Sequence, residues 1–251
     1  MSPLTKVKKD AMNHSPAPGG ERAAGAQLDS GMSKTLHHGL EILETLARHP
    51  HGLSITDLAD TVGVHRTVAH RLVRTLEAHR LCRRDHTKRV TLGAGLVTLA
   101  EPVEQDLRTV AGPVMEELAE RTRSTAHLVL RENETEVRAL LVVEPRNAQV
   151  HVAFRPGQIH PIDRGSAGLA MLAALPAVPG ERPEVETARD RGYALTRGEV
   201  VATMFGISAL VPRRRGEPET TIGISVFEVD DENALATAVR AAARQLGTLL
   251  H

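Results

Sequence analysis

The chain has 251 residues, with 31 basic and 31 acidic side chains and 41% hydrophobic residues. This composition is typical of a folded globular protein and excludes a fibrous chain or one disordered throughout. The single cysteine excludes intramolecular disulfides and a zinc site built from several thiolates. The length suits two domains, each large enough to bury its own core.

The charges are unevenly distributed along the chain. Residues 32–92 carry ten basic and six acidic side chains, a net charge of +4, and eight of the 13 histidines. Residues 1–31 have a net charge of +1, and residues 93–251 have one of −5. A basic segment suits a polyanion, whereas the acidic segment contains all the aromatic residues and suits a packed domain that need not contact nucleic acid.

Residues 1–31 are rich in Pro, Gly, Ala and Ser without helical or strand period, which predicts a disordered N-terminal arm. Its lysines precede no apolar stretch, so it does not resemble a secretory signal. The longest apolar stretch, Leu169–Val178, is about half of the roughly 20 residues that a membrane span requires. We therefore expect a cytoplasmic protein without a membrane partner.

Residues 33–63 predict two helices and a turn. The first helix has apolar residues at helical spacing, with Ile42 and Leu46 beside them. These spaced residues are Leu36, Leu40, Leu43 and Ala47. The stretch Ser54–Asp57 is typical of a capping box that begins a second helix, which ends near Val62. Gly63 then predicts a tight turn.

A third helix and a hairpin follow the turn. The third helix is predicted from an apolar face of Val64, Val68, Leu72 and Leu76. Two short alternating segments, residues 81–84 and 89–92, flank the polar residues 85–88 and predict a wing. Residues 32–93 are therefore predicted to form a winged helix-turn-helix DNA-binding domain.

The third helix and the wing hold the candidate DNA contacts, because a helix fits the major groove and arginine pairs bidentately with guanine. The base-reading candidates are Arg66, Thr67, His70 and Arg71. Further contacts are predicted at Ser54, Arg74, Arg83, Arg84, Lys88 and Arg89, chiefly with phosphates. The predicted partner is double-stranded operator DNA.

The remaining sequence predicts an α+β domain. Residues 94–112 are predicted to form a connecting helix broken at Pro102, and a new helix to begin at Gly112-Pro113. Strands are expected at residues 126–131, 136–144, 148–155, 206–212 and 221–228. Helices are expected at residues 165–175 and 233–250, so the second domain covers residues 113–251.

Several of these stretches resemble IclR-type transcriptional regulators. In the first domain they are Leu53–Ala59, Gly63-Val64 and Ala69–Leu76. In the second they are Arg155–Gly157, Ser166–Ala170, Arg191–Ala194, Arg197–Glu199 and Gly206–Ala209. The resemblance covers residues 32–250. It implies a GAF-like effector-binding domain for an organic or aromatic acid, a repressor without catalysis or cofactor, and a homodimer or homotetramer.

The resemblance also implies a set of effector contacts. They are Ser166, Ala167, Thr196, Gly206, Ser225 and Phe227. The first two begin a predicted helix, where free backbone amides attract an anion. Some family members have an acidic residue at the position of Thr196 and a serine at that of Phe227, so we expect a larger or partly apolar ligand. The segment 172–191 is short and is expected to lack a helical excursion of the family.

Other functions remain open at this stage. Residues 164–168 partly match a nucleophile elbow, but Arg164 replaces its first glycine and no triad partner is evident. His127, His151 and His160 either line the cavity or serve the structure. The neighbours His37 and His38 point to different sides of a helix, so no metal site is expected. The alternatives are a hydrolase or a DNA-binding or interaction module without a ligand.

Overall fold

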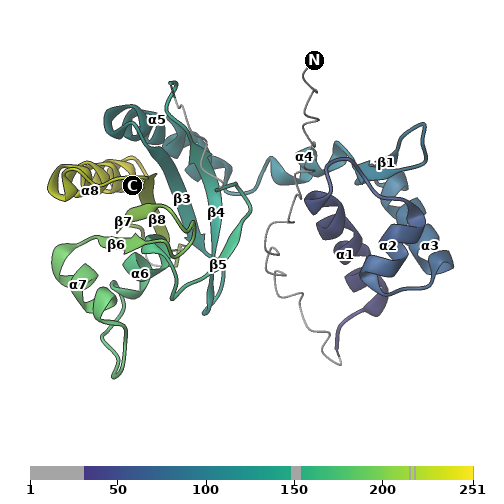
Figure 1. Ribbon diagram of the computed structural model, residues 1–251, viewed down its shortest axis with the longest axis horizontal. Coiled ribbons are helices and arrows are strands. Elements are labelled where there is room, and N and C mark those ends of the chain that lie inside the picture. Colours follow the sequence, from purple (N-terminus) through teal and green to yellow (C-terminus); the bar gives the residue numbers. More distant parts are fainter. Residues whose placement is uncertain (1–30, 148–153, 215, 218, 251) are drawn as a thin grey trace, which may run out of the picture. The chain divides into compact units, whose positions relative to one another are not determined.

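The computed structural model describes residues 31–147, 154–214, 216–217 and 219–250. The chain divides into two compact units, with the boundary between Leu96 and Val97 (Figure 1). The predicted N-terminal arm, except its last residue, lies outside the described residues, as does most of the strand expected at residues 148–155. A short helix, α4 (Gly95–Ala100), spans the boundary.

The first unit is a winged helix-turn-helix, as predicted. It consists of α1 (Lys34–Arg48), α2 (Ile55–Val62), α3 (Arg66–Ala78), β1 (Cys82–Arg84) and β2 (Val90–Leu92). The strands form an antiparallel hairpin. The core is built from Ile42, Leu46, Leu58, Leu72, Val73, Cys82 and Val90. Burial raises the pKa of the Cys82 thiol to about 11, so this cysteine stays protonated in the core at neutral pH.

Local signals set the turn between α2 and α3. The Ser54 hydroxyl accepts a hydrogen bond from the Asp57 amide at 3.2 Å, and the Asp57 carboxylate accepts one from the Ser54 amide at 3.2 Å. This reciprocal pair is the predicted capping box. Gly63 ends α2 with φ of 73°, a left-handed conformation that costs glycine little.

The buried face of α1 differs from the prediction. The helix buries Gly39, Ile42, Thr45 and Leu46. Leu36 is 62% exposed and Leu40 is 49% exposed, so the predicted core stripe lies mostly on the outside. Helical spacing shows that residues share a face, but it does not show which neighbour covers that face.

The buried face of α3 is also shifted by one residue. Ala69, Leu72 and Val73 are buried, whereas Val68 is 39% exposed and Val64 precedes the helix. The predicted apolar face through Val68 is therefore wrong at that position. The outward side chains of α3 are unaffected, because they lie opposite Ala69 and Val73.

The second unit is a six-stranded antiparallel sheet with helices on both faces (Figure 1). Its strands are β3 (Thr125–Arg131), β4 (Glu136–Val143), β5 (Ile159–Pro161), β6 (Ala194–Arg197), β7 (Phe205–Leu210) and β8 (Thr220–Val226). The strand order is β5-β4-β3-β8-β7-β6. The long helices α5 (Gln105–Thr122) and α8 (Glu232–Leu249) pack on one face, and α6 (Ser166–Leu172) and α7 (Pro183–Arg191) lie on the other. This confirms the predicted α+β class.

Strand alternation decides which side chains reach each face. In β3, Ala126 and Leu128 pack in the core beneath α5 and α8, while Val129 belongs to a separate cluster with Met171 of α6. His127 therefore points to the α6 face. The same alternation in β7 and β8 sends the isoleucines to the α5 and α8 side and the small polar residues to the α6 side.

Two predictions about this unit are wrong. No helix begins at Gly112-Pro113, because α5 begins at Gln105 and continues through Pro113. The ring of Pro113 is on the exposed side, where the carbonyl that it leaves unpaired can bond to water. The segment 172–191 does contain a helix, α7, which begins at Pro183. A first-turn proline is favourable because that amide would be unpaired anyway.

Candidate nucleic-acid interface and ligand cavity

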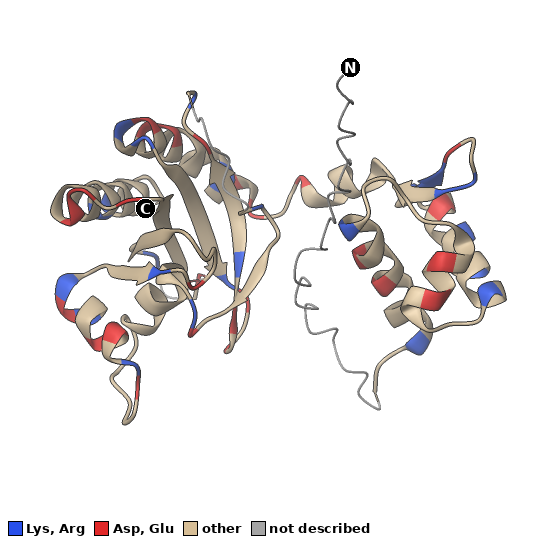
Figure 2. Ribbon diagram, in the orientation of Figure 1, with Lys and Arg blue, Asp and Glu red and all other residues tan. Residues whose placement is uncertain are grey.

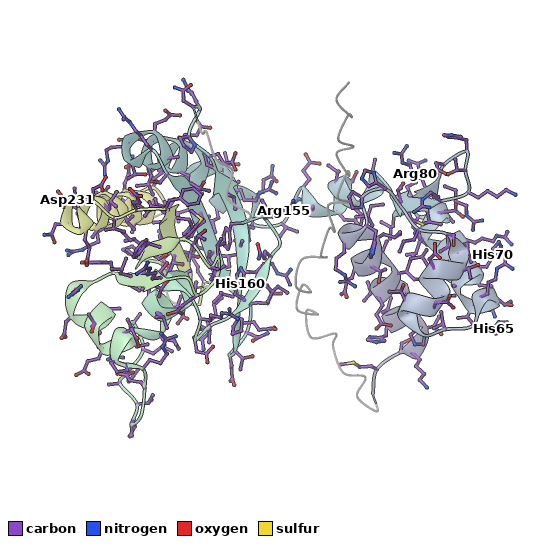
Figure 3. The ribbon with its side chains drawn as sticks, viewed as in Figure 1. His65, His70, Arg80, Arg155, His160 and Asp231 are labelled. Carbon is purple, nitrogen blue, oxygen red and sulfur yellow. The ribbon has the colours of Figure 1, made fainter. Side chains whose placement is uncertain are left out.

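The five predicted contacts on α3 are all exposed on one side of the helix. They are Arg66, Thr67, His70, Arg71 and Arg74. His65, which was not predicted, precedes them and accepts a hydrogen bond from the Thr67 amide through Nδ1 at 3.3 Å. Figure 3 shows His65 and His70 pointing outward from this part of the unit. The sequence signal that could have identified His65 is its place between Gly63 and the start of α3, where a side chain that accepts a hydrogen bond caps the helix.

The wing residues divide into two pairs. Arg83 and Lys88 are exposed. Arg84 forms an ion pair with Glu77 at 3.1 Å, and Arg89 donates hydrogen bonds to the carbonyls of His51 at 3.0 Å and Gly52 at 2.6 Å. These two guanidinium groups hold the hairpin against the unit, and their contact with phosphates stays a prediction.

Ser54 is likewise engaged inside the unit. Its hydroxyl donates to the Asp57 carboxylate at 2.9 Å and forms the cap of α2. Figure 2 shows basic residues on α3 and β1 and acidic residues on α1 and α2. The basic side of the unit is therefore the side of α3 and the wing.

A cavity of about 50 Å³ lies in the second unit, on the α6 face of the sheet. Five of the six predicted effector contacts line it, namely Ser166, Ala167, Thr196, Gly206 and Ser225. Phe227 does not line it. That side chain follows the end of β8, is 44% exposed and borders a separate, more open hollow.

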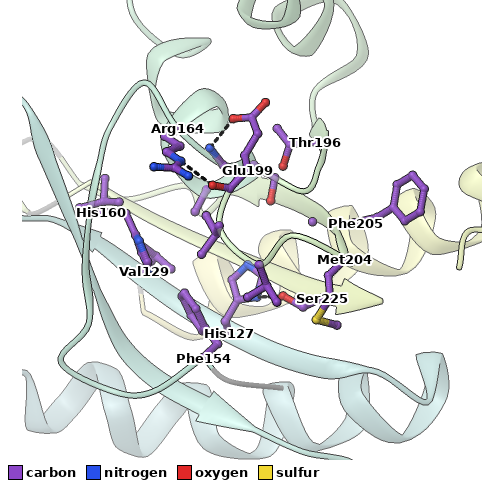
Figure 4. A pocket seen from close by; sticks show the side chains of 17 residues that line it. His127, Val129, Phe154, His160, Arg164, Thr196, Glu199, Met204, Phe205 and Ser225 are labelled. Atoms are coloured by element: carbon purple, nitrogen blue, oxygen red, sulfur yellow. Dashed lines mark hydrogen bonds between the residues drawn. The ribbon is translucent and has the colours of Figure 1, made fainter. Parts of the chain in front are cut away.

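The lining combines an apolar wall with polar groups. Phe154 stacks on His160, with 5.5 Å between ring centroids, and meets His127 edge to face at 5.3 Å. The apolar wall is completed by Val129, Val137, Val200, Val201 and Met204. Figure 4 shows Arg164, Glu199 and Thr196 toward one end of the cavity and His127, Phe154 and Ser225 toward the other. His127 and His160 thus line the cavity, and His151 lies outside the described residues.

Two glycines make room for the polar groups. Gly206 pairs with Thr196 on one side and Ser225 on the other, so these residues form one row across three strands. A methyl group at Gly206 would lie 2.6 Å from the Ser166 hydroxyl oxygen. Ser166 therefore occupies the space that a side chain at this position would fill.

The second glycine, Gly223, lies between Ser208 and His127 in the neighbouring row. A methyl group there would lie 2.5 Å from His127 Nε2. Because this space is empty, His127 Nε2 and the Ser208 hydroxyl meet across the middle strand at 3.2 Å. The Ser208 hydroxyl in turn lies 2.8 Å from that of Ser166, and the Ser225 hydroxyl lies 3.5 Å from His127 Nδ1.

The amide at the start of α6 is already occupied. The Glu199 carboxylate accepts a hydrogen bond from the Gly165 amide at 2.8 Å and forms an ion pair with Arg182 at 2.9 Å. Glu199 belongs to the loop between β6 and β7, whose valines and methionine cover the cavity. The Glu199 carboxylate thus occupies the Gly165 amide, which directly precedes Ser166 and Ala167, the two residues predicted to bind an anion.

Burial lowers the pKa of His127 to about 4, so its imidazole is neutral at pH 7. In the unfolded chain the same group has a pKa near 6.5 and binds a proton first as the pH falls. As the pH is lowered from about 6.5 to about 4, we therefore expect the free energy of unfolding of the second unit to decrease by up to about 3 kcal/mol.

Urea unfolding at several pH values, followed by the fluorescence of Tyr193, tests this expectation, because Tyr193 is the only tyrosine and lies in this unit. The variant His127→Gln should lose this part of the pH dependence. An equal pH dependence in the variant and the parent protein would show that His127 does not carry it.

The described residues that line the cavity do not form a catalytic triad. Both ring nitrogens of His127 face hydroxyl groups, and Ser166 reaches His127 only through Ser208. A triad needs a carboxylate to orient the imidazole and a direct bond from the imidazole to the nucleophile. Among the described residues, no three His, Cys, Asp or Glu side chains are grouped to hold a metal ion. No helix in the described part of the chain is long and apolar enough to cross a membrane.

Comparisons with known proteins agree with both units. The IclR helix-turn-helix domain family matches residues 35–86. The transcriptional regulator KipR of Bacillus subtilis is 26% identical over 156 residues, which cover 61% of this chain and 59% of KipR. The regulator TtgV of Pseudomonas putida is 29% identical over 157 residues, 60% of each chain. The chain thus spans about three fifths of the length of these relatives.

A solved structure is similar over nearly the whole chain. It is an IclR homolog from Microbacterium hydrocarbonoxydans complexed with 4-hydroxybenzoate, with a TM-score of 0.74 and 23% identity. The similarity covers 86% of this chain and 98% of the homolog. At this identity the similarity establishes the fold, with both units in the same order along the chain.

Proposed function

We propose that the chain is a ligand-responsive transcriptional regulator of the IclR family, whose helix-turn-helix domain matches residues 35–86. It binds double-stranded operator DNA through the first unit and a small organic acid in the cavity of the second, acting as a repressor without catalysis. The observation that carries the proposal is the exposed row of basic and polar side chains on α3, presented by a helix-turn-helix whose core lies on the opposite side. Such a protein acts where the DNA is, in the cytoplasm.

The side chains of α3 have different roles in this proposal. Arg66, Thr67, His70 and Arg71 lie in the first half of the helix and read base edges in the major groove. Arg74, one turn further on, contacts a phosphate, as do Arg83 and Lys88 of the wing. Each phosphate contact releases counterions, so binding should weaken steeply as salt rises.

The effector is proposed to be an organic acid, as for the homolog complexed with 4-hydroxybenzoate. Arg164 lines the cavity and supplies a positive charge, and the Phe154 and His160 rings suit a planar or partly apolar ligand. The cavity of about 50 Å³ is smaller than the predicted larger ligand. A ring-sized acid therefore requires the loop between β6 and β7 to open, and tight binding of glyoxylate or pyruvate would contradict the prediction of a larger ligand.

The exposed stripe on α1 is proposed to join two copies of the chain. Leu36 and Leu40 continue a helical row with Met32, Leu43 and Ala47, and the unit leaves this row mostly uncovered. A pair of such helices would bury it and place two copies of α3 on one DNA molecule. An operator with two half-sites requires two copies of the chain. Contacts between the second units would join two such dimers in a homotetramer.

Replacing Leu40 by glutamate should halve the mass of the protein in solution, because a charge in the buried stripe costs far more than the contact it replaces. Operator affinity should then fall by about tenfold or more, since each half-site binds alone. Sedimentation measures the mass and fluorescence anisotropy the affinity. The control is Lys34→Glu, which places a glutamate on another side of α1. Unchanged mass in Leu40→Glu would exclude this interface.

The function is tested by titrating the purified protein against the DNA upstream of its own gene, followed by fluorescence anisotropy. A salt series and a competitor of unrelated sequence belong to the same experiment. We expect tight, salt-sensitive binding that survives the competitor and is weakened by the effector. Weak binding that is equal on operator fragments and on unrelated DNA would contradict the proposal.

A further inference from the structure

The polar side of the cavity is one continuous chain of hydrogen-bonding groups. It runs from the Ser166 hydroxyl through Ser208 and His127 to the Ser225 hydroxyl, with links of 2.8, 3.2 and 3.5 Å. Ser208 is fully buried and does not line the cavity, whereas Ser166, His127 and Ser225 do. Because both ring nitrogens of His127 face hydroxyl groups, the hydrogen-bonding groups of this chain left for a ligand are the Ser166 and Ser225 hydroxyls. The direction of the hydrogen bonds between these four side chains therefore determines whether Ser166 and Ser225 donate to a ligand or accept from it.

The number of protons in this chain is limited. A neutral imidazole has one N–H group and one bare nitrogen, and each serine hydroxyl donates once. If His127 is protonated on Nε2, it donates to Ser208, Ser208 donates to Ser166, and Ser166 donates into the cavity. Ser225 then donates to Nδ1 and offers the cavity only lone pairs.

The other tautomer reverses every bond. With the proton on Nδ1, His127 donates to Ser225, which is then free to donate into the cavity. Ser208 donates to Nε2 and accepts from Ser166, so Ser166 offers only lone pairs. In either state one end is a donor and the other an acceptor, and the low pKa of His127 keeps a charged imidazole, which would donate at both ends, from forming at neutral pH.

We propose that this chain makes the cavity selective for acids with a carboxylate at the Ser166 end and a hydrogen-bond donor at the Ser225 end, with His127 protonated on Nε2 in the complex. The positive charge of Arg164 determines which end of the cavity receives the carboxylate of the ligand. Arg164 precedes Ser166 by two residues, lines the cavity, and lies toward the end opposite Ser225 (Figure 4). Thr196 lies at the same end, beside the Ser166 hydroxyl.

The proposal excludes a dicarboxylate, because its second carboxylate would face the lone pairs of Ser225. It disfavours an acid without a donor, because that ligand would leave Ser225 unpaired in a buried site. An unpaired buried polar group typically costs enough to lower affinity about tenfold. This inference rests on the proposed effector site and adds the chemical class of the effector.

The test is calorimetric titration of the full chain with two series of acids of different size. One series is 4-hydroxybenzoate, benzoate and terephthalate, and the other is glycolate, acetate and oxalate. We expect the hydroxy acid to bind about tenfold or more tightly than the other two members in the series that fits. Equal or tighter binding of a dicarboxylate, or no binding in either series at millimolar concentration, would overturn the proposal.

Ser225→Ala provides the matched variant. It should remove the preference for the hydroxy acid over the unsubstituted acid, by raising the affinity for the latter, which no longer leaves a buried hydroxyl unpaired, and by lowering the affinity for the former. A merely structural role would weaken both equally. Nitrogen NMR of ¹⁵N-histidine-labelled protein reads the tautomer directly, with the His127 signal identified by its absence in His127→Gln. A signal from Nε2 without a proton in the hydroxy-acid complex would overturn the proposal.

Operator binding is measured separately. Loss of operator binding with the ligand preference intact would overturn the proposed function alone, whereas operator binding with no preference would overturn only this inference.

Discussion

Arg71→Glu is expected to lower operator affinity by roughly 100-fold or more, because it removes a base contact and places a carboxylate against the DNA. Arg71 is exposed in the middle of the outward side of α3, opposite the buried Ala69 and Val73. Its loss should leave the core of the first unit unchanged. Anisotropy titration with the operator and with unrelated DNA measures the effect on specific and nonspecific binding.

The control for this variant is Arg244→Glu, which makes the same change at an exposed position of α8 in the second unit. It should bind the operator like the parent protein. Thermal unfolding and Tyr193 fluorescence should show that Arg71→Glu has an intact second unit. Retention of a normal operator footprint by Arg71→Glu would mean that α3 is not the base-reading helix.

Gly206→Ala is expected to lower effector affinity about tenfold to 100-fold, because the new methyl group would lie 2.6 Å from the Ser166 hydroxyl oxygen. Ser166 must then rotate away from Ser208 and into the cavity. The ligand loses both space and a hydrogen bond to its charged group, and the latter alone is worth about 1.5–3 kcal/mol. Calorimetry with the acid that binds the parent protein best measures the change.

Operator binding by Gly206→Ala should be normal and should no longer respond to the effector. The control is Gly112→Ala, in α5 of the same unit, where a methyl group would meet no atom within 4 Å. Unchanged effector affinity in Gly206→Ala, with the control behaving normally, would place the effector outside this cavity.

Signals within a few residues of one another were read correctly from the sequence. The capping box at Ser54 and Asp57 and the glycine turn at Gly63 depend only on neighbours along the chain, so they predicted the helix-turn-helix. The outward residues of α3 follow from the same local periodicity. The alternating segments around residues 85–88 similarly predicted the hairpin. In the second unit the longer strands and the last helix were predicted, whereas the short β5 and β6 were not.

The resemblance to known regulators added what local patterns do not contain. Five residues from α6, β6, β7 and β8 were expected to share a site, and the structure brings them to one cavity. Phe227 was included because the resemblance implies an effector contact at this position. The strand ends before it, however, so alternation no longer directs its side chain to the cavity.

The tertiary structure alone decided which partners each residue meets. The stripe of Leu36 and Leu40 had the spacing of a core face, but the fold covers the neighbouring face of α1. Arg84 and Arg89 were predicted as DNA contacts from their place in the wing, and only the fold showed that Glu77 and two carbonyls bind them within the unit. His127 and Ser208 are 81 residues apart and meet only because Gly223 lies between them in the sheet. Local patterns depend on residues a few positions apart, so the sequence shows them directly. The contacts named here join segments far apart in the sequence, and they form only when those segments pack or pair in a fixed register.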